Sequence, residues 1–158
     1  MKKQQITKGA ILEINIENKY YTYAQILENA GYAFFDYRTE VPLKEFSVLE
    51  NKKILFIVAV YNDVITQGRW LKVGKLNIRE EIRKQPMKFI QDALNPENFE
   101  LYDPNTGEIT PTTKKHIKGL ERAAVWEAHH VEDRIRDYYN GVPCVWLAED
   151  IELFNSIE

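Results

Sequence analysis

The sequence predicts an α+β protein, mainly antiparallel β, in which a curved sheet or small barrel is packed against one long C-terminal helix. Three observations predict it. Short strand-like segments follow one another in the N-terminal half, one nearly all-apolar β-branched run lies among them, and a long segment of helical periodicity comes near the end. A chain of 158 residues that is 44% hydrophobic normally forms one domain with a sizeable core. We therefore expect a single domain over residues 1–158.

The N-terminal segments predict three strands in succession. Leucine and isoleucine alternate with polar residues over 10–16, which is the pattern of a strand with one wet face. The tyrosine-rich segment 20–27 suits a second strand, and the turn at 17–19 predicts that the two form a hairpin. A third strand is expected over 32–37, after an Asn-Ala-Gly turn, with Phe34 and its neighbour on opposite faces. Three such strands favour a meander.

The next segments predict the most buried part of the sheet. A loop is expected over 38–53, with a turn of helix at 43–46. The run 54–61 is almost wholly apolar and β-branched, so we expect a strand that is covered on both faces. After a turn, a further short strand is expected over 70–73, ended by Gly74.

The second half is less regular before its helix. A helical turn is expected over 79–84, whereas 87–94 fits either a strand or a helix. The segments 99–103 and 108–110 flank a Pro-Asn-Thr-Gly turn, which predicts a second hairpin. A last strand is expected over 145–147, before an acidic, partly apolar tail.

The longest periodic segment predicts a helix over 114–139. Thr112 or Thr113 is expected to cap its start, and Gly141 and Pro143 to end it. Residues at steps of three and four form an apolar stripe: Leu120, Ala124, Ala128, Val131, Ile135 and Tyr138. We expect this stripe to face the core.

One flank of the same helix carries groups that bear chemistry: Trp126, His130, Asp133 and Asp137. Imidazole and carboxylate groups on one ridge suggest a metal site or an acid–base pair. However, His129 and His130 are adjacent and point about 100° apart, whereas two metal ligands on one helix are spaced by four residues. Surface ion pairs, Glu132 with Arg136 and Arg134 with Asp137, are the favoured interpretation. We therefore predict no catalytic residue, no metal and no cofactor.

Composition excludes several classes of protein. A net charge of -3 and a pI near 5.7 argue against general nucleic-acid binding, although Tyr20, Tyr21, Tyr23 and Trp70 would suit base stacking. The single cysteine, Cys144, forms no intrachain disulfide and is typical of a buried structural thiol. No apolar run approaches the ~20 residues of a membrane helix or has the form of a signal peptide. We expect a soluble, cytoplasmic protein that contacts neither membrane nor nucleic acid.

Several blocks of the sequence resemble one known family. They are KGAILEINI at 8–16, YTYAQIL at 21–27, LFIVAV at 55–60, GRWLKVG at 68–74 and ERAAVWEAHHVEDRIRDYYNGVP at 121–143. In this order they are similar to the immunity protein 26 family of bacterial polymorphic-toxin systems. The resemblance implies a non-enzymatic, mostly β protein that binds and neutralises a cognate toxin, which is often encoded beside it. It implies no catalytic or metal-binding residue.

A toxin partner gives the exposed acidic and aromatic groups a predicted role. If the toxin is a nuclease with a basic groove, carboxylates can oppose that groove, while aromatic rings suit interface hot spots. The candidate toxin contacts are Asp36, Glu40, Trp70, Asp103, Asp133, Glu149 and Asp150. The alternative is a small-molecule-binding or metal-dependent enzymatic barrel with its pocket near Trp126, His130 and Asp133. The oligomeric state is left open.

Overall fold

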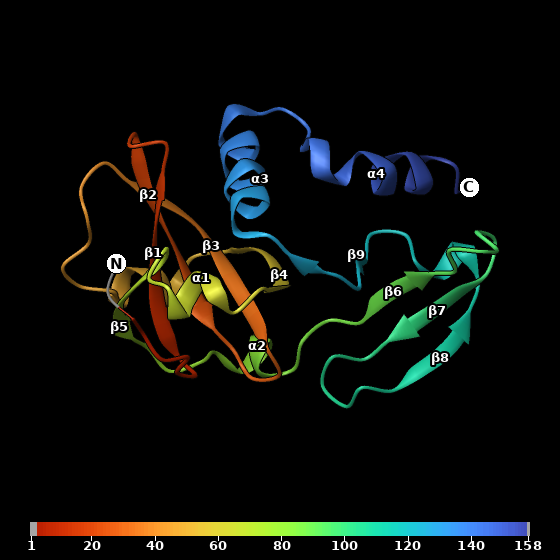
Figure 1. The fold of residues 1–158 in the computed structure, drawn as a ribbon, viewed down its shortest axis with the longest axis horizontal. Helices are drawn as coiled ribbons and strands as arrows, with labels where there is room; N and C mark the ends of the chain where they lie inside the picture. The colour runs from red at the N-terminus through yellow and green to blue at the C-terminus, as the bar shows by residue number, and fades with distance from the viewer. Residues whose placement is uncertain (1–2, 158) are drawn as a thin grey trace. The chain divides into compact units, whose positions relative to one another are not determined.

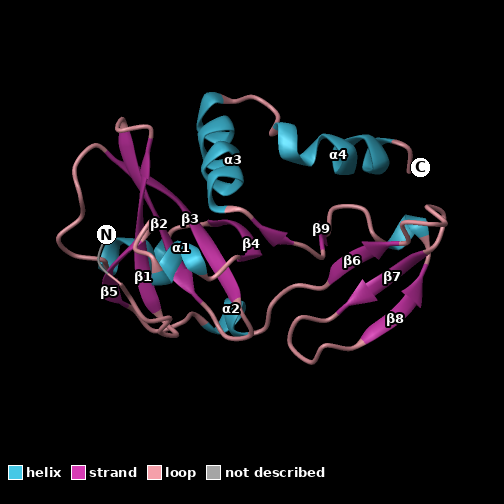
Figure 2. Cartoon of the chain, in the orientation of Figure 1, coloured by secondary structure: helices cyan, strands magenta, loops and turns pink. Residues whose placement is uncertain are grey.

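The computed structural model describes residues 3–157 and confirms the α+β class (Figure 1). Within these residues ten strands form two mostly antiparallel sheets, which Figure 2 separates by colour from the helices. The chain divides into two compact units. Unit 1 comprises the chain up to Lys84 together with Val125–Glu132, and unit 2 comprises Gln85–Ala124 and the chain from Asp133 onward. The sequence predicted one sheet where the structure has two.

Unit 1 contains a six-stranded sheet. Its strands are β1 (Ala10–Ile16), β2 (Tyr20–Ile26), β3 (Gly31–Thr39), β4 (Ile54–Val60), β5 (Leu71–Lys75) and β10 (Val125–Trp126). Their order is β10-β4-β3-β2-β1-β5, and every pair is antiparallel except the parallel pair of β10 and β4. The predicted meander of the first strands is therefore confirmed.

The first hairpin follows from its turn residues. Glu17 and Asn18 both have positive φ, 53° and 59°, the conformation that the two central residues of a tight hairpin require. The Asn15 side chain accepts a hydrogen bond from the Asn18 backbone N–H at 2.9 Å, which stabilises the turn. This turn sets the register in which Ile16 faces Tyr20.

Two predictions in unit 1 are wrong in detail. The helical turn expected at 43–46 is absent, and a 3-10 helix, η1 (Ser47–Asn51), follows instead. Gly74 does not end the strand but lies inside β5. A Cβ atom at this position would meet the Phe46 ring at 2.6 Å, so the glycine is needed for that close approach. The short helices α1 (Asp63–Thr66) and α2 (Glu80–Arg83) lie in segments predicted as a turn and a helical turn.

Apolar side chains cover both faces of the unit 1 sheet. Phe34 stacks on Phe56 with ring centroids 4.7 Å apart and meets the edge of Trp70 at 5.7 Å. The next residue, Phe35, belongs to a separate cluster with Ile11, Tyr23 and Leu49. The predicted placement of the two phenylalanines on opposite faces is confirmed by these different packing partners, although the pairing of β3 with β4 shifts register between them.

Unit 2 contains the second sheet and most of the helical residues. Its strands are β6 (Lys88–Gln91), β7 (Phe99–Tyr102), β8 (Ile109–Thr112) and β9 (Glu121–Arg122), in the order β8-β7-β6-β9. The pairs are antiparallel except the parallel pair of β6 and β9. The helical elements are η2 (Lys114–His116), α3 (Ala128–Asn140) from Asp133 onward, η3 (Val145–Leu147) and α4 (Ala148–Asn155). The core is a cluster of Phe89, Phe99 and Ile117.

The predicted long helix is wrong in its first half. It begins at Ala128 and not at 114, because Gly119 has φ +85° and residues 121–122 and 125–126 pair with strands. The predicted stripe therefore loses Leu120 and Ala124, which precede the helix.

The end of the predicted stripe and the predicted last strand are also wrong. Tyr138 is exposed, whereas Val131 and Ile135 are buried as expected. The strand predicted at 145–147 is the 3-10 helix η3, and the tail forms α4.

None of the helices in the described part of the chain has the length and apolar character that a membrane-spanning helix needs.

Candidate functional site

The candidate contact residues fall into both units. Asp36, Glu40 and Trp70 belong to unit 1, and Asp103, Asp133, Glu149 and Asp150 belong to unit 2. The units also differ in charge. Unit 1 has 14 Lys and Arg against 12 Asp and Glu, for a net +2, while unit 2 has 7 against 12, for a net -5. The acidic excess of the protein therefore lies in unit 2.

The two candidate carboxylates of unit 1 lie in the second half of β3 and directly after it. Asp36 is half-buried in the strand, and its backbone N–H donates to the Lys53 carbonyl at 2.8 Å. Glu40 is exposed in the segment that follows the strand. Both stay predicted toxin contacts.

Trp70 lies in the core of unit 1, with only 1% of its surface exposed. Its indole Nε1 donates to Oε2 of Glu132 at 2.9 Å. Arg69 donates to both oxygens of the same carboxylate, from Nε at 2.9 Å and from a terminal nitrogen at 2.8 Å. A partner protein would contact the residues that cover Trp70, and not the buried ring itself. The Gly-Arg-Trp element thus holds the N-terminal part of α3 to the rest of unit 1.

The carboxylate of Glu132 also affects the arginine beside it. Its hydrogen bond raises the pKa of Arg69, and the charges of Glu132 and Asp63 raise it further, against the opposite effect of burial. Three donors on one carboxylate form a fixed, charge-assisted group. This arrangement is structural, because it joins α3 to the Gly-Arg-Trp element of the same unit.

The predicted ridge of Trp126 and His130 is not a helical ridge. Trp126 lies in β10, and its carbonyl accepts a hydrogen bond from the Tyr61 N–H at 3.1 Å. His130 lies in α3, where its ring meets the ring of His129 at a centroid distance of 4.2 Å. Among residues 3–157, no group of three His, Cys, Asp or Glu side chains is placed to hold a metal ion.

Asp133 takes part in a network at the C-terminal part of α3. It accepts a hydrogen bond from Trp146 Nε1 at 2.9 Å and one from Arg136 at 3.1 Å. Arg136 also donates to the buried Asp137 at 3.1 Å. The backbone N–H of Val142 donates to the Asp137 carbonyl at 3.0 Å, which fixes the turn after the helix. This predicted contact therefore lies in a well-ordered network.

Asp150 and Glu149 are neighbours in α4 with different surroundings. Asp150 is buried and accepts a hydrogen bond from Arg122 Nε at 2.9 Å, while Arg122 also donates to Gln91 at 3.1 Å. Glu149 is exposed. Of the two, Glu149 is directly accessible to a partner.

Asp103 lies at the second hairpin of unit 2. Its Oδ1 accepts hydrogen bonds from the backbone and the side chain of Asn105, both at 2.8 Å. Its carbonyl accepts another from the Gly107 N–H at 2.8 Å, and Gly107 has φ +81°. Asp103 thus has a clear role in shaping the turn, and its toxin contact stays a prediction.

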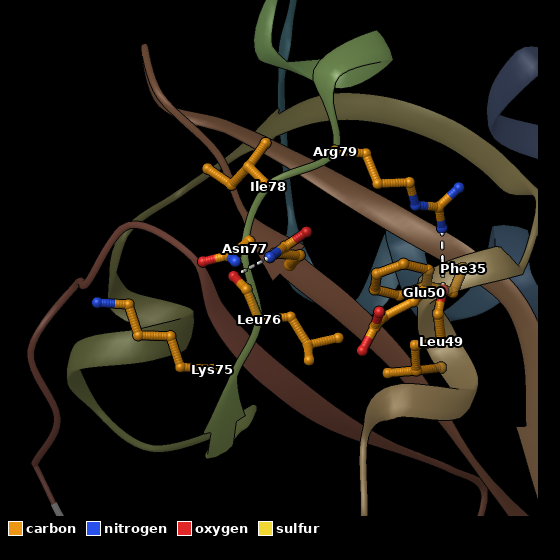
Figure 3. A pocket seen from close by; sticks show the side chains of 9 residues that line it. Phe35, Leu49, Glu50, Lys75, Leu76, Asn77, Ile78 and Arg79 are labelled. Atoms are coloured by element: carbon orange, nitrogen blue, oxygen red, sulfur yellow. Dashed lines mark hydrogen bonds between the residues drawn. The ribbon is translucent and has the colours of Figure 1, made fainter.

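A pocket of about 530 Å³ opens in unit 1, and the residues described as lining it do not include those that the alternative function named (Figure 3). Phe35, Leu49, Leu76 and Ile78 form its apolar lining, and Gln25, Glu50, Lys75, Asn77 and Arg79 its polar lining. The Arg79 guanidinium lies over the Phe35 ring at 5.5 Å and donates to the Leu49 and Lys52 carbonyls. The buried Gln25 amide donates to the Leu76 carbonyl at 2.8 Å. These polar groups hold η1 and the segment after β5 to the sheet.

Cys144 is buried, as its apolar sequence context predicted. Burial raises the pKa of its thiol above the ordinary value of 9.0. The backbone N–H groups of Trp146 and Leu147 act against this shift. A thiol with a raised pKa is protonated at neutral pH and is a poor nucleophile.

Sequence reasoning missed one surface. Val142, Val145 and Trp146 are large apolar residues that lie within five positions of one another and are all exposed. We call this group the bend surface, since it lies where the chain bends from α3 to α4. The prediction of a strand at 145–147 concealed it, although the Val-Pro-Cys-Val-Trp sequence after a helix-ending glycine was a signal for a turn.

Comparison with known proteins gives one family. The family model described as Immunity protein 26 matches residues 7–100. No curated protein and no solved structure matches the chain. The matched range begins before β1, includes β5 and β6, and ends inside β7. The block at 121–143, the longest of those that resemble the family, lies outside it.

Proposed function

The chain belongs to the immunity protein 26 family, and from this premise we propose that it binds a cognate polymorphic toxin in the bacterial cytoplasm and neutralises it. The family match, which covers more than half of the chain, is the observation that carries the proposal. Inhibition is stoichiometric: the protein covers a functional surface of the toxin and turns over no substrate. No cofactor takes part.

For the class of toxin we infer a nuclease. A nuclease presents a basic groove to its substrate, and complementary charge speeds association and favours the correct partner. The net charge of -5 in unit 2 supports this choice. Exposed carboxylates on that unit, such as Glu100, Glu108 and Glu149, are available for such contacts.

A toxicity-rescue experiment tests the proposal. The toxin domain encoded beside this gene is expressed in a host cell, with and without the immunity protein. We expect growth only when both are present, and degraded nucleic acid when the toxin is alone. Failure to bind and protect against every neighbouring toxin would remove the proposal, whereas rescue from a toxin that leaves nucleic acid intact would remove only the nuclease assignment.

The ratio of the two proteins separates a binder from an enzyme. With purified components, a stoichiometric inhibitor abolishes toxin activity when the two are present in equal amounts. Titration of the toxin with increasing immunity protein therefore gives a linear loss of activity that ends at equivalence. Complete inactivation by a small fraction of an equivalent would support the enzymatic alternative instead.

A further inference from the structure

The bend surface exposes three large apolar side chains in a short stretch of chain. Val145 is 65% exposed, Val142 50% and Trp146 46%, while Cys144 between them is turned inward. A single exposed apolar residue needs no explanation, but a group of them rimmed by polar residues marks an interaction site. Tryptophan is in addition the residue most enriched in interface hot spots.

The surface is held in one conformation. Trp146 Nε1 donates to Asp133, Val142 N–H donates to the Asp137 carbonyl at 3.0 Å, and Leu147 N–H donates to the Cys144 carbonyl at 3.1 Å. Arg136 joins Asp133 to Asp137. A surface that is already ordered loses little conformational entropy when a partner binds.

The charges around this surface leave an acidic excess. The arginines of the region have carboxylate partners: Arg122 pairs with Asp150, Arg134 with Glu121, and Arg136 with Asp133 and Asp137. Glu149 and Glu152 on α4 are exposed, and within residues 3–157 no ion pair forms on either. Because η3 leads directly into α4, Glu149 follows Val145 by about one helical turn. A partner that fits is apolar at its centre and basic at its rim.

We propose that the bend surface is where the toxin docks, with Val142, Val145 and Trp146 against an apolar patch of the toxin and Glu149 and Glu152 opposite its basic residues. This inference rests on the proposed function and assigns it to a place on the molecule. The occupant is the toxin domain and not a second copy of this chain, because two copies would bring the same unpaired carboxylates together.

Binding of an inactivated toxin domain, encoded beside this gene, to single-site variants tests the inference. Val145→Lys places a charge in the apolar contact and repels the basic rim, so we expect the Kd to rise at least about tenfold. Leu94→Lys is the matched control, because Leu94 is in the same unit, is 97% exposed and lies outside the bend surface. Val142→Lys repeats the test at a second position, so a folding defect in one variant does not decide the result.

A charge reversal tests the chemistry of the partner. Val145→Glu disturbs the apolar contact equally but attracts basic residues, so it should weaken binding less than Val145→Lys does. Equal losses of affinity in Val145→Lys and Val145→Glu would overturn the inference that basic residues surround the apolar patch of the toxin.

The outcomes distinguish this inference from the proposed function. If the wild type binds the toxin and both lysine variants bind equally well, the docking surface is wrong and the function stands. If no neighbouring toxin binds the wild type, both fail. Sedimentation of the free protein gives the remaining outcome: a dimer that Val145→Lys dissociates would assign the surface to a second copy and overturn the inference.

Discussion

The two units use the same hydrogen bond for different purposes. In unit 1 the indole of Trp70 donates to Glu132 at 2.9 Å, and in unit 2 the indole of Trp146 donates to the next residue, Asp133, also at 2.9 Å. The first ring is 1% exposed and the second 46%. One tryptophan therefore stabilises a core, while the other is held at the surface.

The wider packing follows the same division. Among residues 3–157, twenty-three of the buried apolar side chains belong to unit 1 and five to unit 2. The named ion pairs of unit 2 are more buried: the side chains of Arg134 and Glu121 are 11% and 28% exposed, against 47% for Arg69 in unit 1. Apolar packing is therefore concentrated in unit 1, and the less exposed of these ion pairs lie in unit 2.

The largest expected effect belongs to the core tryptophan. Trp70→Ala leaves a cavity beside Phe34 and removes a donor from Glu132, so we expect it to lower the free energy of unfolding by about 4 kcal/mol. Denaturant unfolding measures the loss, and a cost below about 1 kcal/mol would contradict a dominant core in unit 1. The same curves test the prediction of a single domain, since unit 2 then unfolds in the same transition.

The next largest effect is a loss of stability at alkaline pH, and it comes from Tyr32 in unit 1. Burial raises the pKa of Tyr32 to about 12 from 10.0. Between pH 10 and pH 12 the unfolded chain loses this proton while the folded protein keeps it, so stability falls with rising pH by about 3 kcal/mol. Tyr32→Phe should remove that part of the pH dependence. At neutral pH it should also stabilise the protein, because no described residue hydrogen-bonds this buried hydroxyl.

Denaturant unfolding at several pH values gives the measurement. Tyr61→Phe is the matched control, because Tyr61 belongs to the same unit and is exposed. Parallel loss of stability in wild type and Tyr32→Phe would show that other groups cause the alkaline transition.

A smaller effect tests the ion pairs of unit 2. Arg134→Met removes two hydrogen bonds to Glu121, of 2.9 and 2.8 Å, and should cost about 2 kcal/mol. Arg69→Met removes a similar pair in unit 1 but should cost less than about 1 kcal/mol, because that arginine is far more exposed. Equal costs in the two units would remove the contrast between them.

The smallest expected effect is at the exposed tryptophan. Trp146→Phe keeps an apolar ring and loses the hydrogen bond to Asp133, so the thermal midpoint should change little, with a cost below about 1 kcal/mol. Calorimetry provides the measurement. A loss as large as that of Trp70→Ala would mean that Trp146 supports the fold rather than serving a partner.

The two units also differ in how well the sequence predicts them. The β1 and β4 strands lie within one residue of their predicted limits, because the alternating pattern of β1 and the continuous β-branched run of β4 are local signals. The start of α3 was missed, since β9 and β10 are two-residue strands whose parallel partners lie far away in the sequence, whereas its end lies within one residue of the prediction. The helical spacing of Leu120 and Ala124 did not outweigh these strand pairings.

The candidate site follows the same rule. Exposed Glu40 and Glu149 are carboxylates of the kind expected at a surface, whereas Trp70 and Asp150 proved to be buried. Their burial depends on partners distant in sequence: Trp70 is held by Glu132 and Asp150 by Arg122. Spacing along the chain contains no signal for such pairs. The bend surface was missed for a different reason, because the apolar segment 145–147 was predicted to form a strand.

The close approach of Gly74 and Phe46 has a consequence for variation within the family. A Cβ atom at position 74 would lie 2.6 Å from the Phe46 ring, so a larger residue there requires that ring to move or to be replaced by a smaller side chain. The two positions are 28 residues apart, yet they should change together during evolution. A relative with alanine at the equivalent of Gly74 is expected to have lost the aromatic ring at the equivalent of Phe46.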